Sequence, residues 1–306
     1  MIKNKLSIII PSCNEKYLQR TIDCINESAK GDIEIIVYLD VYWPDPPLKK
    51  DDKITVIHSG KKFGMRPGIK AAMRIVNGQY IMKCDAHCSF DEGFDLKLKE
   101  DYQKGDLVIP ERWNLNHETW EKARGPYHYL YLSYPLHHDE TYGIGFHGKK
   151  WKGECGDDGG FWYLEEKRKD ILIDEILTFQ GSCWFTEKEH LEKIEYPDCE
   201  NYGYCGNEAQ EIGFKTWLSG GRVVRNKKTW YGHLHKSKKT TGGRGFFINK
   251  KEKDKSTQYS AWCWMNNKWP GQVRDLKWLI DKFMPLDGWP ADWHEKDYSQ
   301  LKLKFK

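Results

Sequence analysis

Short apolar segments that alternate with helix-like segments restrict the fold of this chain most. Residues 5–11, 33–39 and 80–84 are mostly apolar and rich in β-branched side chains, while 16–28 and 68–76 have the apolar spacing of helices. Strands that lack alternating polar residues are buried on both faces, which is typical of a parallel sheet covered by helices. The sequence therefore predicts an α/β fold with a mostly parallel central sheet flanked by helices.

Polar residues stand directly after these strands. Ser12-Cys-Asn-Glu follows the first strand, Asp40 the second and Asp85-Ala-His87 the third. Parallel sheets bind ligands at the carboxyl ends of their strands, so we expect a site there. A carboxylate and an imidazole two positions apart project to the same side and suit Mn²⁺ or a similar divalent cation. An isolated Asp-x-His pair is also common in a purely structural setting.

The middle of the chain, residues 111–174, is rich in Trp, Tyr, His and Gly and has weak periodicity. Within it, 112–117 and 153–160 are expected to be long loops, which are segments that often carry function over a scaffold. Regular elements are expected again downstream: a strand at 178–185, a helix at 207–219 and a strand at 223–224.

Charge and tryptophan are concentrated in the last part of the chain. From Lys236 to the end there are 16 basic and 8 acidic residues, a net +8, together with six of the 14 tryptophans. Residues 236–255 are basic, contain Gly242-Gly-Arg-Gly and predict a flexible loop. A basic, aromatic extension suits a polyanionic or sugar-bearing acceptor. The simpler interpretation is a segment that packs back on the core and keeps a lysine-rich face in water.

Composition excludes several classes of protein. The 14% of aromatic residues argues against intrinsic disorder, and no apolar run approaches the roughly 18 residues of a membrane span. The amino terminus lacks the layout of a signal peptide, so we expect a soluble, cytoplasmic protein with reduced thiols. Cysteines are nine in number, and a structural zinc site is conceivable but has no paired CxxC pattern to support it. Its candidate ligands are Cys84, Cys88, Cys155, Cys199 and Cys205.

Three further motifs follow the first half in a characteristic order. They are Phe179-Gln-Gly-Ser-Cys-Trp-Phe, the segment 206–221 beginning Gly-Asn-Glu-Ala-Gln-Glu, and Trp230-Tyr-Gly-His233. Together with Asp85-Ala-His87, this order resembles GT-A glycosyltransferases of the family-2-like superfamily, and within it the catalytic domain of polypeptide N-acetylgalactosaminyltransferases. The resemblance covers about residues 5–235 and includes no appended lectin domain.

This resemblance implies a division of the chain. Residues 1–235 would form the GT-A catalytic domain, with a nucleotide-binding half at 1–110 and an acceptor and donor-sugar half at 111–235. Residues 236–306 would form the basic loop and the Trp-rich extension.

The resemblance also implies roles for individual residues. Asp85, His87 and His233 match metal ligands, with His235 as a competitor for the third place; both histidines could instead be ordinary loop residues. Glu208 matches a glutamate that contacts the donor sugar, and Glu211 a second acidic residue on the same helix, although a helix-surface charge would also explain Glu211. The residues implied to bind the nucleotide sugar are Pro11, Ser12, Asn14, Asp40, Arg66, Lys70, Gly181 and Ser182.

Two of these assignments depart from the pattern or have a simpler explanation. The family has an acidic residue before the position of Asp40, where this chain has Leu39. Arg66 and Lys70 would balance diphosphate charge but fit solvated helix cations equally well.

The implied activity is metal-dependent transfer of a sugar, from a UDP-sugar, to a hydroxyl acceptor. Inverting members carry an Asp directly after the glutamate matched by Glu208, and this chain has Ala209 there, which favours retention of configuration. The acceptor could be a protein, a glycan or a hydroxylated base in DNA, which would have to be flipped out or single-stranded. The sequence also leaves open a non-catalytic sugar or nucleic-acid binder and a nucleotidyltransferase.

Overall fold

The computed structural model describes residues 1–136, 145–150, 166–237, 241, 243–299 and 301. The first half of the sheet has the parallel order β3-β2-β1-β4, in which β2, β4 and most of β1 are mainly buried and apolar while the edge strand β3 is largely exposed or half-buried. Helix α1 buries Leu18, Ile22 and Ile25, which share one helical face. The elements of this half are β1 (Ile2–Ser12), α1 (Leu18–Ser28), β2 (Ile33–Asp40), β3 (Ile54–Ser59), α2 (Met65–Met73) and β4 (Gly78–Cys84).

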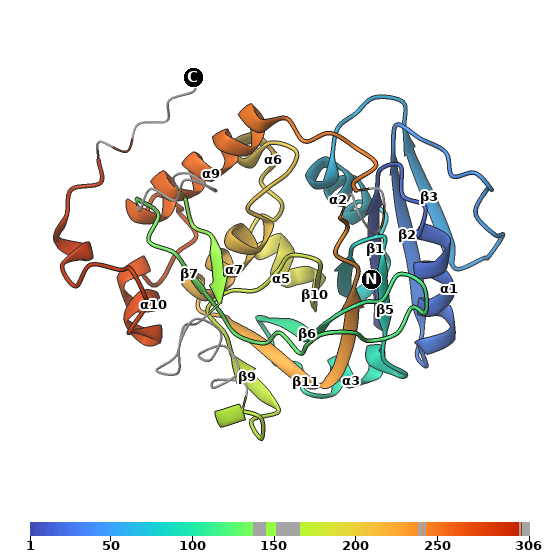
Figure 1. Ribbon diagram of the computed structural model, residues 1–306, viewed down its shortest axis with the longest axis horizontal. Coiled ribbons are helices and arrows are strands. Elements are labelled where there is room, and N and C mark those ends of the chain that lie inside the picture. The colour runs from blue at the N-terminus through green and yellow to red at the C-terminus, as the bar shows by residue number, and fades with distance from the viewer. Residues whose placement is uncertain (137–144, 151–165, 238–240, 242, 300, 302–306) are drawn as a thin grey trace.

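The sheet continues from β4 through an antiparallel strand into the second half (Figure 1). Strand β10 lies antiparallel between β4 and β6, and β6 pairs in parallel with β11 over nine residue pairs, from Arg222 with Asp106 to His233 with Asn114. The longest ladders are parallel, so the predicted α/β architecture is confirmed. The strands here are β5 (Cys88–Phe90), β6 (Asp106–Asn114), β9 (Ile173–Glu175), β10 (Cys183–Glu187) and β11 (Arg222–His233), and a separate pair is β7 (Leu130–Leu132) with β8 (Gly148–Lys150).

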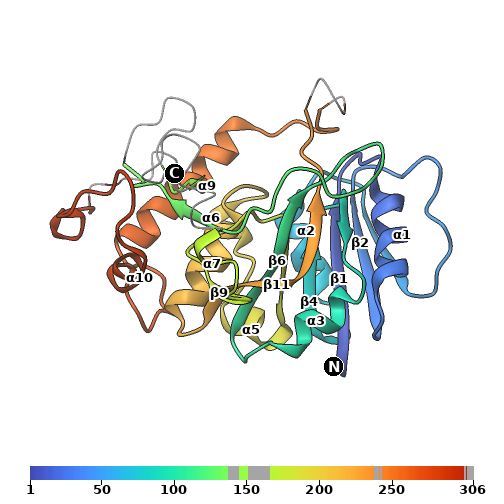
Figure 2. The ribbon, with the colours of Figure 1, turned by 60° about the horizontal axis from the view of Figure 1, so that its bottom comes forward.

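Helix α7 is the central helix of the second half. Nearly all of its side chains are buried, because it packs on β6 and β11 on one side and on α9 and α10 on the other (Figure 2). The remaining helices are α3 (Phe94–Glu100), α5 (Lys188–Lys193), α6 (Cys199–Tyr202), α7 (Glu208–Leu218), α9 (Lys250–Met265), α10 (Leu276–Phe283) and the 3₁₀ turn η1 (Trp293–Glu295).

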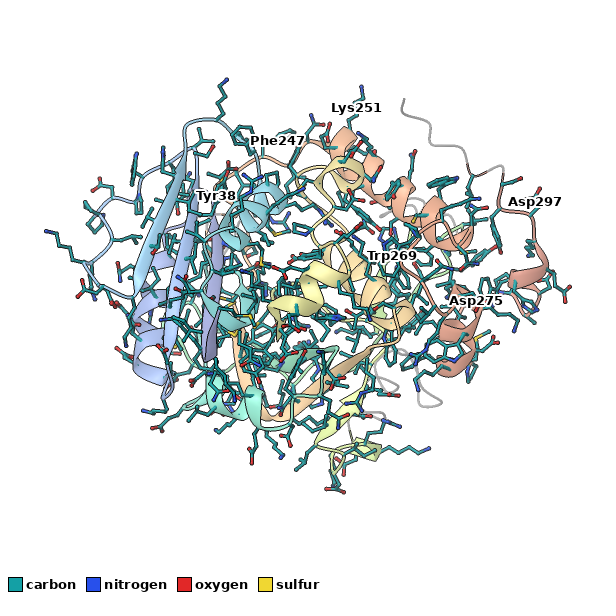
Figure 3. All side chains as sticks on the ribbon, turned by 180° about the vertical axis from the view of Figure 1, so that it is seen from behind. Tyr38, Phe247, Lys251, Trp269, Asp275 and Asp297 are labelled. Carbon is teal, nitrogen blue, oxygen red and sulfur yellow. The ribbon has the colours of Figure 1, made fainter. Side chains whose placement is uncertain are left out.

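Most tryptophans of the carboxyl-terminal extension belong to the protein core. Trp264, Trp269, Trp289 and Trp293 are at most 9% exposed and lie in one hydrophobic cluster with Trp217 of α7. Figure 3 shows Trp269 among the helices of this region. The extension therefore packs back on the core, as the simpler sequence interpretation expected, and these rings are not free to stack on an acceptor.

Two of the expected loops differ from the structure, and a third falls outside the described residues. The predicted loop at 236–255 is too long, because α9 begins at Lys250, where Asn249 caps it by accepting from the Lys251 N–H at 2.9 Å. The expected loop at 112–117 begins as strand, because β6 runs on to Asn114 beside β11. The expected loop at 153–160 lies outside the described residues. Within the described part of the chain, no helix is long and apolar enough to cross a membrane.

Candidate active site

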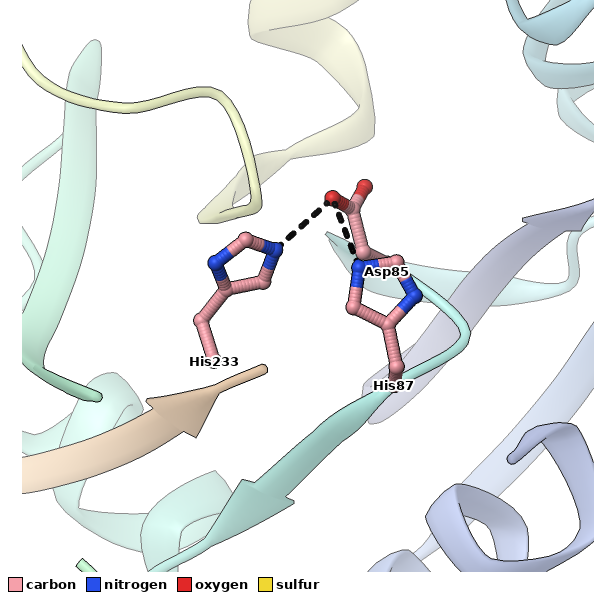
Figure 4. Close-up of side chains that lie close together, drawn as sticks. All are labelled: Asp85, His87 and His233. Carbon is pink, nitrogen blue, oxygen red and sulfur yellow. Dashed lines mark hydrogen bonds and ion pairs between the residues drawn. The ribbon is translucent and has the colours of Figure 1, made fainter. Parts of the chain in front are cut away.

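Three strand ends bring the predicted metal ligands together. Asp85 directly follows β4, where its backbone N–H donates to the Ser182 carbonyl at 2.8 Å. His87 lies in the turn that leads from β4 into β5, and His233 is the last residue of β11, paired with Cys88. Figure 4 shows the two imidazoles on either side of one carboxylate oxygen. The pairing of β11 with β5 thus explains how a histidine 148 positions away in the sequence reaches the aspartate.

The geometry of this cluster suits a divalent cation. Oδ2 of Asp85 lies 3.3 Å from Nε2 of His233 and 3.8 Å from Nε2 of His87. One ligand atom from each residue falls within 4.8 Å of the others, and no other such group occurs among the described residues. A carboxylate oxygen with two imidazole nitrogens fits Mn²⁺ chemistry and leaves positions for other oxygens.

Glu15 orients His87. It is 7% exposed, and its Oε2 accepts from Nδ1 of His87 at 3.0 Å, which leaves Nε2 facing Asp85. Lys236 donates to the same oxygen. Burial alone would raise the pKa of Glu15, but the contacts from His87 and Lys236 lower it, so the carboxylate stays ionised. A carboxylate behind a histidine is the usual support of a metal-ligating imidazole.

Electrostatics prepare the other two candidate ligands for a cation. Burial lowers the pKa of His233 to about 3, against the opposing effect of Asp85, so the imidazole is neutral near pH 7. Burial would raise the pKa of Asp85, but the Lys83 ammonium and the histidines hold it well below its usual range. Metal ligands must be deprotonated, and both groups meet this requirement. Nδ1 of His233 has no partner among the described residues.

His235, the competing ligand, has a different partner. Its Nε2 lies 2.9 Å from Arg112, and because a guanidinium can only donate, this nitrogen is the acceptor. Burial lowers the pKa of His235 to about 4. His233 rather than His235 therefore joins Asp85 and His87.

A cavity of about 460 Å³ opens beside the cluster, which is a size suited to a small-molecule ligand. Helix α2, the loop after β11 and the start of α9 contribute to its walls. The predicted site residues on its wall are Pro11, Ser12, Asp40, Asp85, His87 and His233. Asp40 also holds the turn before α2, because it accepts from the backbone N–H groups of Phe63 and Gly64 at 2.9 and 3.0 Å.

Other predicted nucleotide-binding residues lie away from the described cavity wall. Asn14 is exposed and donates to the Gly245 carbonyl at 3.0 Å, so it fastens the loop after β11. Lys70 is exposed on α2, which agrees with the interpretation as a solvated helix cation. Gly181 and Ser182 lie next to Asp85, because the Ser182 carbonyl accepts from the Asp85 N–H and the Gly181 carbonyl accepts from Lys83. A Cβ at Gly181 would lie 2.9 Å from Oε2 of Glu208, so glycine is needed for this close approach.

Arg66 and Glu211 form a buried pair instead of facing the cavity. Both are 0% exposed, and Arg66 donates to Oε2 of Glu211 and to the Gly206 carbonyl. Oε1 of Glu211 accepts from Lys215 at 3.0 Å and from the Asp198 N–H at 2.7 Å. The buried position of Arg66 does not support the prediction that it contacts diphosphate. It also rules out the alternative interpretation as a solvated helix cation. Glu211 is likewise not a surface charge, and both of its carboxylate oxygens accept hydrogen bonds from other residues of the protein.

Glu208 is buried beside Lys83 and does not belong to the described cavity wall. It is 8% exposed, and its Oε1 accepts from Trp184 Nε1 at 2.9 Å and from Tyr196 at 3.2 Å. Its Oε2 accepts from Lys83 at 3.1 Å, and Lys83 also donates to Asp85. The Glu208 carboxylate therefore has a fixed orientation, and the Lys83 ammonium links it to the candidate metal ligand Asp85.

Sequence reasoning missed Glu15 and Lys83, and it expected Lys236 only as a basic group of the loop, not as a partner of Glu15. Glu15 ends the turn Ser12-Cys-Asn-Glu, and no motif gives this last residue a role. Lys83 has a visible signal, because a lysine inside an otherwise apolar strand needs a buried anion. Lys236 lies only three positions after His233, at the start of the predicted basic loop.

Comparisons with known proteins agree with this fold. A protein-family model described as "Glycosyl transferase family 2" matches residues 7–195. A putative polypeptide N-acetylgalactosaminyltransferase 9 of Drosophila melanogaster is 22% identical over 253 residues, which is 76% of this chain and 36% of the relative. The crystal structure of GalNAc-T7 with UDP, GalNAc and Mn²⁺ superposes with a TM-score of 0.63 at 14% identity, over 91% of this chain and 57% of that one.

The chain thus spans well under two thirds of the length of both relatives. The family model, by contrast, covers more than half of this chain and includes β1 to β4 with Asp85 and His87. The superposition covers 91% of this chain, so the likeness in fold extends beyond the residues that the family model matches. The chain belongs to glycosyltransferase family 2 and has a GT-A-like α/β fold.

Proposed function

We propose that the protein is a divalent-cation-dependent glycosyltransferase that moves a sugar from a UDP-sugar to a hydroxyl acceptor. The observation that carries this proposal is the cluster of Asp85, His87 and His233 on the wall of a cavity at the carboxyl edge of the sheet. The solved relative contains UDP, GalNAc and Mn²⁺, which supports the same kind of donor and metal here.

Mn²⁺ would be held by Asp85, His87 and His233, and it would supply positive charge for the departing diphosphate. The protein's own groups keep the site ready for this. Glu15 fixes the orientation of His87, and burial keeps His233 neutral. Pro11, Ser12 and Asp40 would form the wall that holds the nucleoside.

The segment between β11 and α9 would exclude water from the reacting atoms. Lys236, Arg244 and Phe246 of this segment are on the cavity wall. Asn14 and Lys62 hold it in place, through the Gly245 carbonyl at 3.0 Å and the Phe247 carbonyl at 2.9 Å. A covered donor is less exposed to hydrolysis.

We further propose that configuration at the anomeric carbon is retained. Inversion needs a general base for the acceptor hydroxyl, and the inverting pattern considered in the sequence analysis uses a carboxylate for this. Among the described cavity-wall residues the carboxylates are Glu15, Asp40 and Asp85, and each already has partners. Ala209 follows Glu208, so this position supplies no base either.

The acceptor is a question for experiment, and cytoplasmic location also stays a prediction. On sequence grounds the tryptophan-rich extension suits either a nucleic-acid or a sugar-bearing acceptor, but its buried rings cannot stack on bases. A salt titration of DNA binding tests the hypothesis of a nucleic-acid acceptor, because phosphate contacts make affinity fall steeply with salt.

Release of UDP from a panel of UDP-sugars, with and without EDTA, tests the proposed reaction. We expect activity that EDTA abolishes and Mn²⁺ restores, and that His233→Ala removes. Asp281→Ala is the matched control, because it deletes an exposed carboxylate on α10 that pairs only with Lys277 in the described structure. Full activity in EDTA, together with an active His233→Ala variant, would contradict the proposal.

A further inference from the structure

Lys83 occupies an unusual place for a lysine. It lies in the interior strand β4, its side chain is 0% exposed, and its strand neighbours Met82 and Cys84 belong to the hydrophobic core. Lys83 pairs across the sheet with Trp184 of β10. A buried ammonium is costly unless its charge and its three N–H donors are all matched.

The ammonium has one acceptor for each of its three donors. Nζ lies 2.7 Å from Oδ1 of Asp85, 2.8 Å from the Gly181 carbonyl and 3.1 Å from Oε2 of Glu208. All three acceptors belong to the candidate site. Lys83 itself is not among the described residues of the cavity wall, so it would act through its neighbours.

The contact with Asp85 decides which oxygen can face a cation. Lys83 takes Oδ1, and Oδ2 is left toward His87 and His233 (Figure 4). The contact with Glu208 fixes that second carboxylate relative to the first. Without the ammonium, the buried Glu208 and the partly exposed Asp85 would lose the counter-charge that they share, and their like charges would repel.

We propose that Lys83 is a positioning residue of the active site, which presents Oδ2 of Asp85 to the divalent cation and holds Glu208 in register with it. This inference rests on the proposed metal-dependent function. It adds a residue that acts on metal affinity and turnover without touching the donor.

The chain offers a matched control for a purely structural buried lysine. Lys215 is 3% exposed and donates to Oε1 of Glu211 on the same helix as Glu208 and to the Glu195 carbonyl. Neither Glu211 nor Lys215 belongs to the described cavity wall. Loss of Lys215 should therefore lower stability but leave the metal site intact.

The test measures Mn²⁺ binding by isothermal titration calorimetry and by the electron paramagnetic resonance spectrum of bound Mn²⁺, without any donor present. We expect Lys83→Met to weaken Mn²⁺ binding by about 10- to 100-fold, as for other groups that orient metal ligands, and to change the spectrum. At saturating Mn²⁺, kcat should fall while KM for the UDP-sugar changes little. Lys215→Met should bind Mn²⁺ as the wild type does.

A second pair of variants covers the case in which Lys83→Met does not fold. Glu208→Gln keeps the contact between Lys83 and Asp85, so it should lose turnover but bind Mn²⁺ normally. Lys83→Met combined with Glu208→Gln removes one buried charge of each sign, and it should still bind Mn²⁺ about 10- to 100-fold more weakly.

The outcomes distinguish a failure of the positioning role of Lys83 from a failure of the proposed function. If the variants that lack Lys83 bind Mn²⁺ as tightly as their controls, the positioning role is overturned while the proposed function stands. If the wild type neither binds Mn²⁺ nor depends on it for UDP release, the proposed function fails, and the role of Lys83 fails with it.

Discussion

Glu15→Gln tests the support of the metal site without removing a ligand. The substitution keeps the shape of the side chain but places an amide where Oε2 now accepts from Nδ1 of His87 and from Lys236. Either the amide N–H₂ faces two donors, or it turns and loses the 3.1 Å contact from the Tyr17 N–H. In the first case His87 loses the acceptor that directs its Nε2 toward Asp85, and in the second case it keeps only a neutral oxygen in place of the carboxylate.

The expected magnitudes follow from these contacts. A hydrogen bond to a charged group contributes about 1.5–3 kcal/mol, so the loss of one such contact should lower the free energy of unfolding by about 2 kcal/mol. Loss of an orienting partner typically weakens metal affinity by about 10–100-fold. At 100 times the wild-type Kd, Mn²⁺ stabilises the wild type by about 2.7 kcal/mol, but a variant with 100-fold weaker affinity by only about 0.4 kcal/mol.

The assay is urea unfolding of the whole chain with and without Mn²⁺. Glu34→Gln is the control, because Glu34 is also a hydrogen-bonded carboxylate with a lowered pKa but lies at the opposite end of β2, where it accepts from Ser7 and Asn77. The control should lose stability and keep the full Mn²⁺ response. A Glu15→Gln variant with the wild-type Mn²⁺ response would refute the assignment of Glu15 as the support of His87.

Three further predictions concern the surroundings of the site. Gly181→Ala should reduce kcat and cost about 1–3 kcal/mol of stability through overpacking, because its Cβ would lie 2.9 Å from Oε2 of Glu208; steady-state kinetics beside urea unfolding check this. Glu211→Gln should lower the free energy of unfolding by about 3–5 kcal/mol, since it leaves the buried Arg66 guanidinium without its counter-charge, while calorimetry should find Mn²⁺ affinity unchanged. Burial lowers the pKa of His190 to about 4, below the unfolded value of about 6.5, so His190 contributes stability above pH 6.5 that is lost as the pH falls toward 4. The full effect is about 3 kcal/mol, and His190→Gln should flatten the fall in stability measured between pH 7 and pH 4.5.

Local patterns are enough to predict the first half of the fold. Strands β1, β2 and β4 are apolar, and they are bounded by turns that the sequence shows directly. The helices beside them have a clear amphipathic spacing. The order of the motifs then suggests one cluster of Asp85, His87 and His233, and in the structure one ligand atom of each lies within 4.8 Å of the others.

The second half is harder to predict because long-range contacts decide it. Only Val223 and Val224 are expected as strand, yet β11 runs to His233. Arg225 and Asn226 interrupt the apolar pattern, and they are buried because the guanidinium donates to the carbonyls of Pro110 and His128 and the amide to that of Lys97. These partners are remote in sequence, so no local rule could identify them.

The same reason explains why the supporting residues of the site escape prediction. A motif marks side chains that match a ligand pattern, but it does not mark the groups that balance their charge. In the structure, donor and acceptor groups alternate along one chain of contacts on both sides of the candidate cation position. In order, they are Lys236, Glu15, His87, Asp85, Lys83 and Glu208.

Such an alternation has a physical consequence for the reaction. Two ammonium groups, Lys236 and Lys83, face three carboxylates, Glu15, Asp85 and Glu208, and hold them in place before any metal binds. The excess negative charge favours a cation, and the fixed side chains reduce the rearrangement that its binding requires. The cation position lies in the middle of the chain, between Nε2 of His87 and Oδ2 of Asp85, which are 3.8 Å apart, and the neutral His233 lies 3.3 Å from the same Oδ2. A cation there would continue the alternation. The removal of Glu15 on one side, or of Lys83 on the other, should therefore weaken binding of the cation, although neither side chain would contact it.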